Sequence, residues 1–157
     1  DDGRRIDHGT FLYHAAKEGV VDPARSIQVG IRTTYTDPSD FVVRDARAVH
    51  RAGIEETVTH IRAVVGERPC YFTFDIDGLD PAFAPGTGTP VTGGLATWQA
   101  MEIIRGLGRE GGAPINLVGM DVVEVAPPYD HAEITALAGA TMALALTCLY
   151  AEARGFA

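Results

Sequence analysis

Three apolar runs stand out along the chain, and each is bounded by turn-forming residues. They cover Ser26–Arg32, Tyr71–Asp77 and Ile115–Val125 and are rich in Val, Ile and Phe. Nearly continuous apolar character over such short lengths is typical of the buried strands of parallel sheets. The sequence therefore predicts three central strands, with a further short extended piece over residues 40–47.

Segments with helical spacing separate these runs. Ile54, Val58 and Ile61 lie on one helical face, in a segment that ends before Pro69. Thr97 is a candidate cap for a later helix. Helices are expected over residues 11–18, 54–65, 97–108 and 133–153. Alternation of strands and helices without a linker or a repeat predicts one α/β unit spanning residues 1–157, a three-layer α/β/α architecture with a mostly parallel sheet.

Composition narrows the classes of partner. The formal net charge is −8, and the acidic residues are spread along the chain. An acidic protein of this kind is poorly suited to bind nucleic acid through phosphates and is compatible with a small cationic ligand. Cys70 and Cys148 have apolar neighbours. They predict reduced, buried thiols in a cytoplasmic protein, with a disulfide as the alternative.

The stretch Ile134–Ala151 carries no charged residue, so its length reaches the lower limit of a membrane span. Much of it is Ala, Gly and Thr, and we expect a helix buried in a protein core and no membrane segment. The chain opens with Asp-Asp-Gly-Arg-Arg, which does not resemble a signal peptide. This opening reads as the inside of a loop, so a fragment of a longer protein is expected.

Two acids, Asp75 and Asp77, close the second apolar run. Side chains alternate along a strand, so both carboxylates are predicted to lie on one face, at the sheet edge where ligands of α/β proteins bind. Two converging carboxylates repel each other unless a cation neutralises them, and oxygen ligands suit Mg²⁺ or Mn²⁺. The alternative is that both acids only accept hydrogen bonds from backbone N–H groups of the loop.

The residues around this pair resemble the ureohydrolase family, which includes arginase, agmatinase, guanidinobutyrase and formiminoglutamase. The resemblance is carried by Thr73-Phe-Asp-Ile-Asp, three residues, Pro81, three residues, Pro85-Gly86, seven residues and Gly94. It implies an arginase-like fold and a binuclear manganese centre with Asp75 and Asp77 as ligands. Asp80 is expected to be a turn residue before Pro81.

The same resemblance assigns two further site residues. The substrate-binding glutamate of the family corresponds to Glu124, in Gly119-Met-Asp-Val-Val-Glu-Val, where a carboxylate can hold a planar guanidinium. A structural ion pair with Arg is the alternative for Glu124. The proton-shuttling histidine corresponds to His8, in Asp7-His8-Gly9. Asp121 is expected to support the site or to be structural. No role is assigned to His14, His50, His60 or His131.

Within the family, Glu124-Val-Ala-Pro and Tyr129-Asp130 are most similar to agmatinases. The resemblance implies hydrolysis of agmatine to putrescine and urea by a protein that carries two Mn²⁺ and forms trimers or hexamers. The family also needs an upstream histidine and an Asp-x-His-x-Asp segment, and this chain contains neither. The chain is therefore expected to be the C-terminal half of one ureohydrolase domain, inactive when isolated.

Three alternatives remain open. A related ureohydrolase, such as guanidinobutyrase or arginase, would use the same site with another guanidine. A catalytically inactive α/β module would bind a partner through the Ala-rich last helix. A Mg²⁺-dependent phosphotransfer domain would use the Asp-x-Asp pair, but such domains usually also need a later Lys, and Lys17, the one Lys of the chain, lies before the pair.

Overall fold

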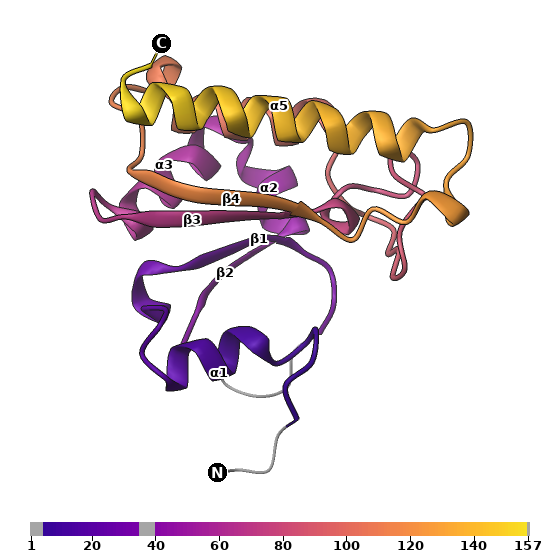
Figure 1. Ribbon diagram of the computed structural model, residues 1–157, viewed down its shortest axis with the longest axis horizontal. Coiled ribbons are helices and arrows are strands. Elements are labelled where there is room, and N and C mark those ends of the chain that lie inside the picture. Colours follow the sequence, from indigo (N-terminus) through magenta and orange to yellow (C-terminus); the bar gives the residue numbers. More distant parts are fainter. Residues whose placement is uncertain (1–4, 35–39, 157) are drawn as a thin grey trace.

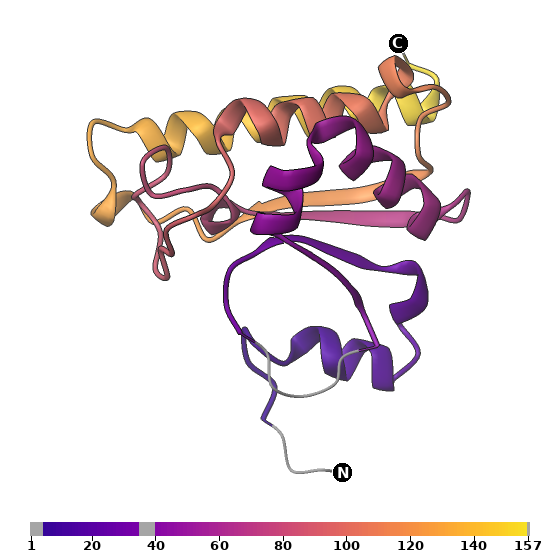
Figure 2. The same cartoon turned by 180° about the vertical axis from the view of Figure 1, so that it is seen from behind.

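The strands form two parallel pairs that lie between helices. The computed structural model describes residues 5–34 and 40–156, so most of the loop expected after the first strand falls outside the described residues. In Figures 1 and 2 the strands lie between α1 on one side and α5 on the other. The helices are α1 (Phe11–Lys17), α2 (Ala46–Ala52), α3 (Ile54–Val65), α4 (Thr97–Leu107) and α5 (Ile134–Arg154).

The strand pairs follow the order of the sequence. β1 pairs with β2, and β3 pairs with β4, in both cases in parallel. In the second pair Thr73 lies opposite Asp121, and Asp75 lies opposite Val123. The parallel direction brings the carboxyl ends of β3 and β4 to one edge. The strands are β1 (Ile27–Ile31), β2 (Val42–Asp45), β3 (Cys70–Asp75) and β4 (Leu117–Val123).

The core lies between the β3–β4 pair and helices α3, α4 and α5. Alternate residues of β3 point into it, and Phe72 and Phe74 pack against the buried cluster. Met142 and Leu146 of α5 are fully buried. This arrangement confirms the predicted α/β class and the parallel pairing, since each helix after a strand returns across the sheet.

The last helix buries only one of its faces. It is the one helix among the described residues that is long and apolar enough to cross a membrane, by length and composition alone. Core helices pass the same test, and α5 packs against β4 and α4 through Ala138, Met142, Leu146 and Leu149. Leu137 and Leu144, on its other face, are exposed. The expected burial therefore holds for one face.

Two local features differ from the prediction. α2 was not predicted, because its segment is short and Ala-rich and gives little apolar periodicity; the Asp45 carboxylate caps it by accepting the Ala48 N–H. Ala96, and not Thr97, precedes α4, where Gln99 accepts the Ala96 N–H. By contrast, α3 covers residues 54–65 as predicted and ends before Pro69, with Gly66 as its C-cap.

The cysteines also differ from expectation. Both are free, Cys70 is partly buried and Cys148 is exposed on α5. The exposed position follows from the uncovered face of α5. Partial burial raises the pKa of the Cys70 thiol.

Candidate active site at the carboxyl ends of β3 and β4

The paired acids lie where β3 ends. Asp75 is its last residue, and Asp77 falls in a short 3₁₀ turn, Ile76–Gly78 (η2). The predicted strand alternation is therefore not what places Asp77. Ile76 is fully buried, and the Asp75 Oδ1 accepts the Asp77 N–H at 3.1 Å. The turn holds both acids beside each other at the strand end, and the backbone hydrogen bond expected in the alternative reading is also present.

A threonine orients the second acid. The Thr89 hydroxyl donates to the Asp77 Oδ2 at 2.9 Å from the loop between η2 and α4. Sequence reasoning did not single out Thr89. Its position in a Gly-, Pro- and Thr-rich loop directly after two acids was the available signal, but such a loop does not specify which of its hydroxyls points back.

Glu124 follows β4 at the same edge of the sheet. Its backbone has φ 63°, in the left-handed region that residues other than glycine seldom adopt. Such strain, which costs on the order of 1–3 kcal/mol, concentrates at functional sites. The strand ends at Val123, so the left-handed backbone lies directly where the chain leaves β4.

His8 meets Glu124 from the other end of the sequence. The His8 Nδ1 lies 3.1 Å from the Glu124 Oε1, and the His8 side chain is otherwise 91% exposed. Asp7 stabilises the loop that carries it, because its Oδ1 accepts the Gly9 N–H at 3.0 Å. The two residues that the resemblance placed in the site are thus brought together across 116 positions of sequence.

The site concentrates negative charge. Partial burial raises the pKa of Asp75 to about 6; the Asp77 N–H opposes this shift, and the Asp77 and Glu124 carboxylates add to it. A bound cation would relieve this repulsion. In residues 5–34 and 40–156, no group of three or more His, Cys, Asp or Glu is placed to hold a metal ion. Asp75 and Asp77 therefore fit a metal as part of a larger ligand set.

Steric fit explains two glycines of the sequence pattern. A Cβ on Gly94 would lie 2.5 Å from the Asp80 N and 2.6 Å from the Leu79 carbonyl carbon. A Cβ on Gly86 would lie 2.7 Å from the Asp130 Cβ and 2.8 Å from the Asp130 Cα. Since backbone cannot yield as a flexible side chain can, both positions need glycine for the loop to pack beside the acids.

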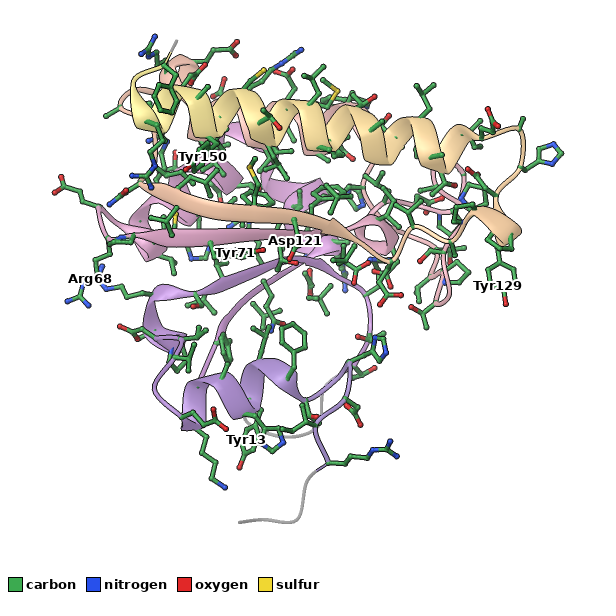
Figure 3. All side chains as sticks on the ribbon, in the orientation of Figure 1. Tyr13, Arg68, Tyr71, Asp121, Tyr129 and Tyr150 are labelled. Carbon is green, nitrogen blue, oxygen red and sulfur yellow. The ribbon has the colours of Figure 1, made fainter. Side chains whose placement is uncertain are left out.

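Asp121 lies opposite Thr73, two residues before Asp75 along β3, and contacts Tyr71. The Tyr71 hydroxyl donates to the Asp121 Oδ2 at 3.0 Å, and this hydrogen bond raises the pKa of the phenol. Figure 3 shows both side chains between the β3–β4 pair and the β1–β2 pair. Tyr129, also labelled there, lies exposed beyond the end of β4. Asp121 therefore makes a structural contact within the sheet.

Comparisons with known proteins point to one family. The arginase family model matches residues 1–148. The agmatinase of Photorhabdus laumondii is 54% identical over 150 residues, which are 96% of this chain and 47% of that protein. The agmatinase of Proteus mirabilis is 53% identical over 149 residues. The chain spans about half the length of the curated relatives it matches.

Solved structures show the same relationship. A hypothetical agmatinase from Burkholderia thailandensis superposes with a TM-score of 0.90 at 53% identity, covering 98% of this chain and 47% of that one. The proclavaminate amidino hydrolase of Streptomyces clavuligerus superposes with a TM-score of 0.86 at 38% identity, covering 98% and 52%. The chain belongs to the arginase family, and its fold is the arginase-like fold predicted from the sequence.

Proposed function

We propose that this chain is the C-terminal half of a metal-dependent ureohydrolase that hydrolyses the guanidinium group of agmatine to putrescine and urea. The observation that carries the proposal is the contact of His8 with Glu124 at the sheet edge where Asp75 ends β3 and Asp77 follows in the 3₁₀ turn. Relatives named agmatinase, at 51–54% identity over nearly the whole chain, support agmatine as the substrate.

In this proposal Asp75 and Asp77 hold metal ions, taken to be two Mn²⁺, together with ligands supplied by upstream residues. Carboxylate oxygens suit this cation. The metal ions supply Lewis acidity, which makes water nucleophilic near neutral pH. Thr89 keeps the Asp77 carboxylate in place through its hydroxyl. The isolated chain, which contains only part of the ligand set, is expected to be inactive.

The substrate is held by charge and shape. The Glu124 carboxylate accepts N–H groups of the planar guanidinium in two parallel hydrogen bonds, which orients the guanidinium carbon toward the acids. His8, beside Glu124, delivers a proton from its imidazole to the departing amine nitrogen. The left-handed backbone of Glu124 presets the direction of the carboxylate before the substrate arrives.

Further features of the whole protein follow from the same proposal. The partner is a small cationic guanidine, with no nucleic acid and no membrane involved, and the protein works in the cytoplasm. The exposed Leu137 and Leu144 on α5 are compatible with a homo-oligomer, a trimer or a hexamer, in which such a face is covered.

One observation favours a second candidate. The proclavaminate amidino hydrolase shares this fold at 38% identity, and its name describes the hydrolysis of an amidino group on a different substrate. The same residues would then act on another guanidine, such as arginine or 4-guanidinobutyrate. The carboxyl-edge site described above reads the guanidinium and not the tail of the substrate.

Urea release by the full-length protein, loaded with Mn²⁺, tests both candidates. Agmatine, arginine and 4-guanidinobutyrate are supplied separately at equal concentration. Release from agmatine above the other two supports the proposal, and release from another guanidine alone replaces the substrate. Absence of urea from all three, with metal bound, contradicts the ureohydrolase assignment. Absence of urea and of bound metal favours a catalytically inactive interaction module.

A further inference from the structure

Arg32 joins three segments of the chain that meet beside the turn carrying Asp77. It follows the last residue of β1, and its guanidinium donates to the Gly30 carbonyl at 3.0 Å and to the Val91 carbonyl from Nε at 3.2 Å and Nη2 at 3.0 Å. Nη2 also donates to the Asp77 carbonyl. One side chain thus holds the end of β1, the turn that carries Asp77, and the loop before α4.

Arg32 contacts the backbone of the turn and of the loop that position Asp77. The Asp77 carbonyl belongs to a residue whose carboxylate faces the site, and Val91 lies two residues after the Thr89 that binds this carboxylate. The Arg32 guanidinium therefore holds Asp77 from the backbone and, through the loop, from the side of Thr89. A planar fork of donors reaches three carbonyls at once, which the point charge of Lys cannot do.

Asp80 completes the support of the loop. Its Oδ2 accepts the Gly93 N–H at 2.7 Å and the Gly94 N–H at 3.2 Å. Backbone hydrogen bonds, first that from Ala82, lower the pKa of Asp80, and the charge of Arg32 adds to this effect. The loop is thus fastened on both sides of Val91, and Arg32 is the part that also reaches Asp77.

We infer that Arg32 is a positioning residue for the metal-binding acids, which sets the place of Asp77 and of the loop carrying Thr89 without touching the substrate. This inference rests on the proposed function of Asp77 as a metal ligand. Groups that orient metal ligands from behind typically contribute about 10- to 100-fold in metal affinity or activity. Loss of the three-carbonyl contact should therefore weaken metal binding more than it weakens the fold.

The chain contains a matched control in Arg62 of α3. Its guanidinium also donates four hydrogen bonds to carbonyls, those of Gly106, Gly108 and Ala113. These residues lie where α4 ends and the chain leads into β4, at the edge of the sheet opposite the acids. R62K should cost a similar number of hydrogen bonds and leave the acids unaffected.

The test uses the full-length protein with R32K, R32Q and R62K. Binding of Mn²⁺ to metal-free protein is followed by the electron paramagnetic resonance signal of free Mn²⁺, and Tm is measured by circular dichroism. R32K and R32Q are expected to weaken Mn²⁺ binding by about tenfold, while R62K lowers Tm and keeps the affinity of the wild type. R32Q retains amide donors, so it keeps the comparison available if R32K does not fold.

Two results would overturn the inference. The first is Mn²⁺ affinity of R32K or R32Q within twofold of the wild type, which would make Arg32 a brace of the fold alone. The second is an equal loss of affinity in R62K, which would make the effect general instability. Failure of the proposed function is distinguished separately: a wild type that binds Mn²⁺ but releases no urea leaves the affinity comparison intact, and a wild type that binds no Mn²⁺ overturns both.

Discussion

His8 and Glu124 form a contact that joins the beginning of the chain to the end of its last strand. The His8 Nδ1 lies 3.1 Å from the Glu124 Oε1, although 116 positions separate the two residues. An imidazole thus lies beside a carboxylate at the carboxyl edge of the strands. In the proposed reaction these residues act on opposite parts of one guanidine, one as the anchor of the guanidinium and one as the donor to the leaving amine.

Replacement of Glu124, the proposed anchor of the guanidinium, should mainly lower kcat/KM. E124Q keeps the size of the side chain and removes its charge, so the charge-assisted hydrogen bonds to the guanidinium are lost. We expect kcat/KM for agmatine to fall about 10- to 100-fold. Steady-state urea release by the full-length protein measures the change. E110Q, an exposed carboxylate at the opposite edge, serves as the control, and an equal loss in E110Q would contradict the role of Glu124.

Replacement of the proton donor should act on turnover. H8N retains a polar side chain without an imidazole, and we expect kcat to fall about 10²- to 10⁴-fold with a smaller change in KM. H131N alters another exposed histidine, which follows Asp130, and should keep the kcat of the wild type. Wild-type kcat in H8N would show that the amine leaves without help from His8.

The raised pKa of Asp75 predicts a pH dependence of stability. The pKa of Asp75 is about 6 in the folded protein, against an ordinary value of 3.8. The ionised Asp75 carboxylate therefore lowers the stability of the metal-free fold. The stability that the folded protein gains from a protonated Asp75 is fully present below about pH 3.8 and is lost as pH rises through about 6. D75N should therefore raise the Tm of metal-free, full-length protein at pH 8 and leave it nearly unchanged at pH 4. A lower Tm of D75N at pH 8 would contradict the electrostatic account.

Addition of a methyl group at Gly94 should distort the loop beside the acids. G94A places a Cβ against the backbone of Asp80 and Leu79, and we expect the free energy of unfolding to fall by about 1–3 kcal/mol, as for other overpacked sites. In G78A the new Cβ has no atom within 4 Å, and stability should stay within about 0.5 kcal/mol of the wild type. Denaturation in urea measures both; equal stability of the two variants would refute the steric explanation.

Periodicity was sufficient for the main elements of the fold. The runs that predicted strands end within two residues of the observed β1, β3 and β4, and the helical spacing of 54–65 matches α3. Each of these elements buries an apolar face, so its apolar residues recur at the spacing of a strand or a helix and can be recognised in the sequence. α2 could not be found in this way, because its start depends on the Asp45 cap and its segment carries little apolar spacing.

The candidate site was only partly predictable. Asp75, Asp77, Glu124 and His8 were singled out, and the structure brings His8 to Glu124 and Asp77 to Asp75. Thr89 and Arg32 were missed, because each acts by a contact across a turn or between distant segments. The left-handed backbone of Glu124 was also not predictable, since no glycine or asparagine marks it.

The most direct test of the account is urea release from agmatine by metal-free, full-length protein, measured before and after addition of Mn²⁺. We expect no urea before the addition and sustained release afterwards. Urea release at the same rate in the presence of a chelator, or its absence with Mn²⁺ bound, would contradict the central claim that this half of the protein contributes acids to a metal-dependent ureohydrolase site.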